Sequence, residues 1–151
     1  LGPTSDTAAA SIERQIEPAA TKPRPAAPSA AIPTELVSRL SQTTLNFAET
    51  RRRAQRQRSM LKTALMDVGS MTGSNWSTAQ LQLSRLNEID VELGVLRDDA
   101  ASIAGDLAAL RARGLPVDAL VDETGTLINI IRSEMDQVAQ IRNSARATLA
   151  S

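Results

Sequence analysis

The stretch that decides the fold is residues 86–110, LNEIDVELGVLRDDAASIAGDLAAL, near the middle of the chain. Its apolar residues recur every three or four positions, which is the spacing of a helix face in a coiled-coil-like seam. The register is unbroken through Leu86, Ile89, Leu93, Leu96, Ala100, Ile103, Leu107 and Leu110. This stretch therefore predicts a long helix with one side buried against neighbouring helices.

Both flanking segments show the same periodicity. The preceding one has its seam at Val37, Leu40, Thr44, Phe47, Arg51, Ala54, Arg58, Leu61, Leu65 and Val68. The following one has its seam at Val117, Leu120, Thr124, Leu127, Ile131, Glu134, Val138, Ile141 and Ala145. Each seam contains charged residues, which is unusual for a buried helix face and identifies them as candidates for ion pairs.

Turn signals separate the three segments. Residues 69–75 are polar and contain two glycines, and the capping-box spacing of Ser77 and Gln80 that follows predicts a helix start, with Trp76 and Leu81 as a hydrophobic staple. Residues 113–116, Arg-Gly-Leu-Pro, combine a helix-ending glycine with a proline suited to a first helical turn. Helices are expected at about 34–69, 77–113 and 116–150.

Short connections between helices of similar length favour antiparallel neighbours. We therefore predict an all-α fold, an antiparallel up-down-up three-helix bundle over residues 34–151. Six of the seven prolines lie within residues 1–33, a segment also rich in alanine. Such a composition is typical of a flexible linker without a core, so this segment is interpreted either as a disordered end or as a tether to an anchor.

Composition argues against several classes of function. The chain has no His, Cys or Tyr, so the commonest neutral-pH acid–base group and the commonest zinc ligands are missing. No nucleophile–base pair, phosphate-binding loop or dinucleotide fingerprint occurs, and we expect no enzyme activity, cofactor, metal or small-molecule substrate. The 17 basic and 17 acidic residues balance, so net charge gives no reason to expect a polyanionic partner.

Charge is nevertheless unevenly distributed along the chain. Residues 51–62 hold six basic residues and no acid, whereas the predicted second helix is acidic at Glu88, Asp90, Glu92, Asp98, Asp99 and Asp106. In an antiparallel hairpin turning near residue 73, residue n lies level with about 146 − n, so the two regions face each other. The third helix runs parallel to the first, which brings Glu134 level with residue 52.

Two ion pairs follow from this register: Arg51 with Glu134, and Arg58 with Glu88. Polar seam residues of this kind commonly fix helix register at some cost in stability. The alternative is that the basic cluster binds a polyanion such as nucleic acid or anionic lipid. The residues expected to point outward and to be free for a partner are Arg52, Arg53, Arg56 and Lys62. Trp76 is a further candidate contact residue at one end of the bundle.

The leading functional expectation is a non-catalytic structural or adaptor protein, a tethered helical rod that docks with other proteins of unknown identity. Its Ala/Pro spacer and its lack of Cys and His are typical of bacterial envelope proteins, which favours a periplasmic or envelope-associated location and leaves a cytoplasmic one open. Polyanion binding through residues 51–62 is the first alternative. The second is a subunit of a larger assembly, such as a secretion apparatus or a virion.

Overall fold

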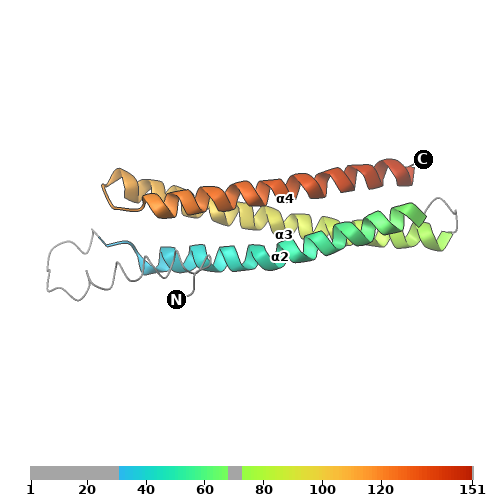
Figure 1. Ribbon diagram of the computed structural model, residues 1–151, viewed down its shortest axis with the longest axis horizontal. Helices are drawn as coiled ribbons and strands as arrows, with labels where there is room; N and C mark the ends of the chain where they lie inside the picture. Colours follow the sequence, from blue (N-terminus) through green and yellow to red (C-terminus); the bar gives the residue numbers. More distant parts are fainter. Residues whose placement is uncertain (1–30, 68–72, 151) are drawn as a thin grey trace. The chain divides into compact units, whose positions relative to one another are not determined.

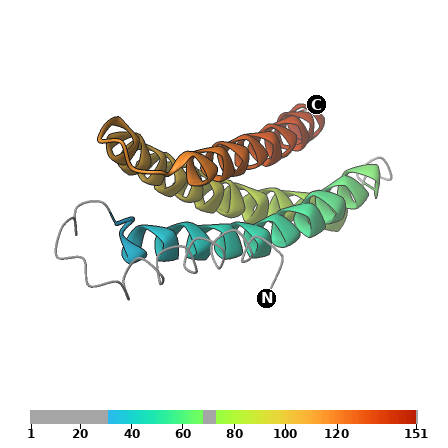
Figure 2. The same ribbon diagram turned by 60° about the vertical axis from the view of Figure 1, so that its left-hand side comes forward.

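The structure, a computed structural model, describes residues 31–67 and 73–150, and the first thirty residues of the predicted tether lie outside this part. Three long helices pack together in it: α2 (Thr34–Asp67), α3 (Gly73–Ala112) and α4 (Asp118–Ala150). Successive helices run in opposite directions, and all three lie alongside one another in both views (Figures 1 and 2). The all-α, up-down-up three-helix bundle is confirmed.

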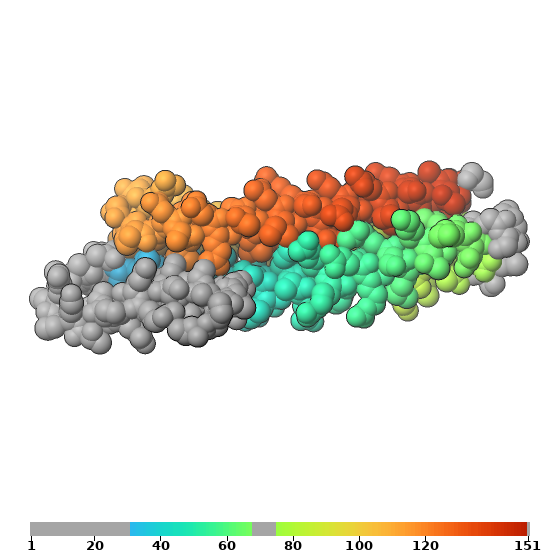
Figure 3. Space-filling view, viewed as in Figure 1, coloured from blue at the N-terminus to red at the C-terminus, as the bar shows by residue number. Residues whose placement is uncertain are grey.

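Contacts divide the chain into two units, to which every helix contributes. In the described residues, the first unit takes α2 up to Leu45, α3 from Asp98 and α4 up to Asn129. The second unit takes the remainder of α2, α3 up to Arg97 and α4 from Ile130. On one face of the second unit, α2 and α4 lie side by side at the surface (Figure 3).

The core contains most of the predicted seam residues, a few others such as Ala79 and Leu83 on α3, and one addition of a whole row. All α3 seam residues are buried except Leu110, and all α4 seam residues except Ile141, both of which are half-buried. The addition is a second buried row on α2, displaced by one residue from the predicted seam: Leu36, Thr43, Thr50, Gln57 and Ala64. Because α2 touches two neighbours, it buries a wider stripe than a single seam.

Contacts assign the two sides of this stripe to different neighbours. The Gln57 amide nitrogen donates a hydrogen bond to the Gln82 backbone carbonyl on α3, 3.1 Å away. Arg58 instead contacts Glu134 on α4. Residues seven apart leave a helix on nearly the same side, so the row containing Gln57 faces α3 and the row containing Arg51 and Arg58 faces α4.

The start of α3 differs from the prediction. The helix begins at Gly73, which places Ser77 inside it and rules out the capping box and staple around Trp76. Tertiary contacts explain the extra turn: the Asn75 amide donates to the Asp67 carbonyl (3.1 Å) and the Trp76 indole to the Leu149 carbonyl (3.4 Å). Carbonyls at helix C-termini lack intrahelical donors, so the first turn of α3 caps both neighbouring helices.

The connection between α3 and α4 contains the predicted glycine. Gly114 has a φ of +86°, a conformation that favours glycine. The Leu115 amide donates to the Leu110 carbonyl and the Gly114 amide to the Arg111 carbonyl, which together form a Schellman motif. Because the Val121 amide bonds to the Val117 carbonyl, α4 starts two residues after the predicted Pro116.

Candidate functional site

The most deeply buried charge of the described residues is the Glu134 carboxylate, at 1% exposure. Its oxygen Oε2 lies 2.9 Å from Arg58 Nη2, and its oxygen Oε1 lies 3.6 Å from Arg51 Nε. The Arg51 guanidinium also lies 6.0 Å from the centroid of the buried Phe47 ring, within cation–π range. One carboxylate on α4 is therefore shared by two arginines that stand two turns apart on α2.

The predicted approach of Arg51 to Glu134 is present, whereas the predicted pairing of Arg58 with Glu88 is wrong. Arg58 lies seven residues after Arg51, so both side chains leave α2 on the side of α4. Glu88 is exposed on α3, whereas the row that contains Arg51 and Arg58 faces Glu134 on α4. The prediction failed because it assigned Arg58 to the side of α2 that faces α3, whereas its side chain contacts α4.

The acidic side chains of α3 pair with arginines on both neighbouring helices. Arg53 binds Glu92 through two parallel hydrogen bonds of 2.7 and 2.9 Å, and Arg142 on α4 donates to Asp90 at 2.8 Å. The Arg53–Glu92 hydrogen bonds lower the pKa of Glu92 and raise that of Arg53. Arg53 is therefore engaged within the bundle, and the prediction that it is free for a partner is wrong.

In the first unit, Arg39 donates to Asp106 at 2.9 Å and to the Ser102 hydroxyl at 3.3 Å. The predicted register places residue 107 level with Arg39 and residue 93 level with Arg53. The observed partners, Asp106 and Glu92, are each one residue away. Charge matching along α2 and α3 thus follows the antiparallel register predicted from the sequence.

A buried amide pair lies beside the cluster of Arg51, Arg58 and Glu134, and it was not predicted. Gln57 and Gln82 are each 8% exposed, and the Gln57 amide donates to both the side-chain oxygen and the backbone carbonyl of Gln82. Such pairing satisfies groups that would otherwise be costly to bury. Only the heptad spacing from Thr43 and Thr50 to Gln57 could have indicated a second polar row facing α3.

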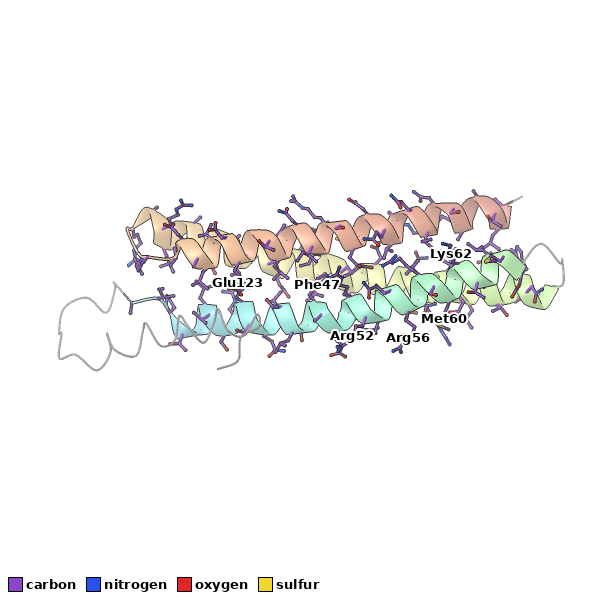
Figure 4. All side chains as sticks on the ribbon, viewed as in Figure 1. Phe47, Arg52, Arg56, Met60, Lys62 and Glu123 are labelled. Carbon is purple, nitrogen blue, oxygen red and sulfur yellow. The ribbon has the colours of Figure 1, made fainter. Side chains whose placement is uncertain are left out.

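Three of the predicted interaction cations remain exposed. Arg52, Arg56 and Lys62 have no ion pair among residues 31–67 and 73–150. They do not form one patch: Arg52 and Arg56 project from the outer side of α2, whereas Lys62 lies on the side towards α4 (Figure 4). A polyanion approaching the outer side of α2 would therefore meet two free arginines, with the exposed Glu49 one turn away.

Apolar side chains are exposed on the outer sides of α2 and α3 in the second unit. Val91 is 68% exposed and Val95 55%, and Leu81, Met60 and Met66 are also exposed. Both valines lie within the stretch that decides the fold, but between its seam positions. The sequence therefore has apolar residues at outward positions of this helix, and the spacing of the seam alone does not identify them.

We define the α2–α3 face by these exposed residues of the two helices in the second unit: Arg52, Arg56 and Met60 on α2 with Leu81, Arg85, Glu88, Val91 and Val95 on α3. An open groove of about 490 Å³ runs into it, lined by Arg56, Ser59, Met60, Thr63, Ala64, Asp67, Thr78 and Gln82. Its lining mixes apolar, hydroxyl and charged groups without a nucleophile–base pair.

Trp76 is 46% exposed, and its indole nitrogen bonds to the end of α4. This contact gives the residue a structural role in capping. Within the described residues, no group of three or more potential metal-ligating side chains is clustered, and no helix is long and apolar enough to cross a membrane.

No known protein family matches the chain, and no curated protein or solved structure shows significant similarity to it. The functional conclusion therefore depends on the chemistry of the α2–α3 face and of the interior alone.

Proposed function

We propose that the chain is a non-catalytic adaptor or structural protein that docks with another protein chain through the α2–α3 face. The observation that carries this proposal is the exposure of Val91 and Val95, neighbours one helical turn apart. Contiguous apolar side chains at a surface often mark a contact with another protein. The apolar surface of each exposed valine is in contact with water, and a bound partner would cover that surface.

In this proposal the ion pairs between the helices stabilise the fold and do not bind a partner. Arg51 and Arg58 both contact the buried Glu134 carboxylate, and Arg53 is held by Glu92. The polyanion-binding alternative then depends mainly on Arg52 and Arg56, which is a small charge for a salt-sensitive interaction. The protein-docking role is favoured because it uses the apolar residues as well as the free arginines.

The proposal extends to location through the sequence alone. The Ala/Pro-rich residues 1–33 suit a spacer that holds the helical part at a distance from an anchor, and the composition is typical of the bacterial envelope. In this arrangement the tether supplies reach and the helical part supplies the contact.

Site-specific photo-cross-linking tests the docking face. A photoreactive amino acid replaces Val95 in one variant and the exposed Asp136 of α4 in a control variant, both in the full chain and in a bacterial host. We expect a covalent adduct with another protein chain from position 95 and none above background from position 136. Equal yields from the two positions would reject the α2–α3 face as the contact surface.

A further inference from the structure

The Glu134 carboxylate is shared unequally by its two arginines. Arg58 Nε donates to Oε2 at 3.1 Å, and Arg58 Nη2 lies 2.9 Å from the same oxygen. Arg51 Nε comes only within 3.6 Å of Oε1, which is too long for a hydrogen bond, and the Arg51 side chain is 45% exposed. A single carboxylate balances only one of two guanidinium charges. Because Arg58 is the closer partner, the charge of Arg51 is left in excess at the surface.

Lys62 adds a second unbalanced charge on the same side of α2. It follows Arg51 by eleven residues, which is three turns and about 20°, so the two side chains leave the helix almost in line and about 16 Å apart along its axis. Lys62 is exposed, lies towards α4 (Figure 4) and has no ion pair with any residue that the structure describes. Arg51 and Lys62 therefore stand on either side of the Arg58–Glu134 pair.

The other acids that the structure describes on α2 and α4 in this unit leave these helices on different sides. Glu49 is two residues from Arg51 and Asp136 is two residues from Glu134, and residues two apart leave a helix about 200° apart. Asp67 lines the groove of the α2–α3 face. The acids of α3 lie behind, because α2 and α4 form the surface on this side (Figure 3). Nothing on this side except Glu134 balances the excess positive charge.

The flank of α4 beside α2 carries uncharged polar groups. Relative to Glu134, Arg142 leaves α4 about 80° to one side and Gln137 about 60° to the other. Arg142 reaches Asp90 on α3, so Gln137 lies on the flank away from α3, and Ser144, seven residues on, shares that flank. Gln137 is half-buried and Ser144 is exposed. We define the α2–α4 face by the residues on this side of the second unit: Arg51, Arg58 and Lys62 on α2 with Glu134, Gln137 and Ser144 on α4.

We infer that the α2–α4 face binds an acidic segment of another protein, whose carboxylates pair with Arg51 and Lys62. The amide of Gln137 and the hydroxyl of Ser144 supply hydrogen bonds beside these pairs. Complementary charge of this kind steers association and fixes its register. The inference goes beyond the proposed function, in which the ion pairs of the bundle bind no partner. It uses only the part of the Arg51 charge that Glu134 leaves unbalanced, and the Arg58–Glu134 pair stays intact.

An acidic protein segment fits this face better than a nucleic acid or a membrane. Three cations and one carboxylate leave an excess of two positive charges. DNA-binding proteins with strong salt dependence make about six to ten phosphate contacts, and basic clusters that bind anionic lipid contain about four to eight basic residues. The face also has no aromatic side chain on which bases could stack. Two carboxylates about 16 Å apart match the excess charge in number and in position.

Titration of the full chain into a fluorescently labelled poly-glutamate peptide tests the inference by anisotropy. We expect saturable binding at low ionic strength that weakens as salt is added. R51Q/K62Q removes both excess charges and should weaken binding about fivefold or more, because two exposed ion pairs are lost. The matched control R132Q/R146Q removes two exposed arginines from the opposite flank of α4. It has the same net charge and should weaken binding less than about twofold.

Two further measurements separate binding from damage to the fold. Circular dichroism of each variant verifies that the helices are retained, and K62Q alone should weaken binding about twofold without any change in the helical signal. In nuclear magnetic resonance spectra, saturating peptide should shift the Nε–H signal of Arg51 more than that of Arg58. The reason is that Arg58 keeps its hydrogen bond to Glu134 when the peptide binds.

Equal weakening by the two double variants would overturn the inference, because the peptide would then respond only to net charge. Absence of saturable binding at low salt would overturn it as well. Tighter binding of a DNA duplex or of phosphatidylglycerol vesicles than of poly-glutamate would reject a protein segment as the occupant. The cross-linking experiment from position 95 probes the separate α2–α3 face, so its outcome distinguishes failure of the proposed function from failure of this inference.

Discussion

Removing the Glu134 carboxylate should destabilise the fold more than any other removal of a single charge in the second unit. Deleting one partner of a buried ion pair costs about 3–5 kcal/mol when the remaining charge stays buried. Here Arg51 is 45% exposed and Arg58 19%, so both guanidiniums retain some hydration. We therefore expect E134A to lower the free energy of unfolding by about 2–3 kcal/mol, which is below that range.

Urea denaturation followed by far-ultraviolet circular dichroism measures this loss, with D136A as the control. Asp136 is exposed on the same helix, and its removal should change stability by less than about 0.5 kcal/mol. Double-mutant cycles should give a larger coupling energy for Arg58–Glu134 than for Arg51–Glu134. The Arg58 Nη2–Glu134 Oε2 distance is only 2.9 Å, and the Arg58 side chain is only 19% exposed. An E134A variant as stable as D136A would refute the reasoning.

Three further predictions concern the interior and the pH dependence. Burial raises the pKa of Glu123, so ionising this carboxyl is more costly in the folded chain than in the unfolded one. The resulting loss of stability is complete above the folded pKa and disappears once the pH is below the unfolded pKa. E123Q should accordingly be more stable than the native chain at pH 7, by less than about 1 kcal/mol, and equally stable near pH 3.5 in urea titrations. Q57L should cost about 1–3 kcal/mol because it leaves the Gln82 amide buried without its partner, whereas a Q57L/Q82L double variant should recover most of that loss; equal stability of single and double variants would contradict this. G94A should raise the unfolding midpoint by an amount equivalent to about 1 kcal/mol, since a Cβ at Gly94 meets no atom within 4 Å; a lower midpoint would show that the glycine is needed.

The helices and their register could be predicted from the sequence because both depend on local spacing. The seam from Leu86 to Leu107 is buried as its periodicity requires, and the hairpin relation placed the partners of Arg39 and Arg53 within one residue. Apolar period and chain direction determine the height of a residue along the bundle. Neither depends on details of packing.

The partner of Arg58 could not be predicted from height alone. The three helices of a bundle can follow one another around its axis in a left-handed or a right-handed order. This handedness decides whether a given side of α2 contacts α3 or α4. Seam spacing is identical in both orders, so the choice between Glu88 and Glu134 required the positions of the helices around the axis. One constraint was nevertheless present in the sequence, because Arg51 and Arg58 are seven residues apart and must face the same neighbour.

The boundaries of α3 and α4 depended on contacts that sequence patterns do not record. Gly73 to Trp76 have little intrinsic preference for a helix, yet Asn75 and Trp76 become helical because their side chains cap α2 and α4. The tertiary contact outweighed the Ser77 capping signal. The glycine at position 114 was predictable because its requirement is local to the turn.

The shared carboxylate also limits how α2 and α4 can slide past each other. In the observed register Glu134 lies between Arg51 and Arg58. A slip of one heptad in one direction would place it between Thr44 and Arg51, and in the other between Arg58 and Leu65. Either slip keeps apolar residues on the seam but removes one of the two cations from a carboxylate with almost no access to water. The apolar pattern alone would tolerate several registers, so the buried charge contributes to the choice of one.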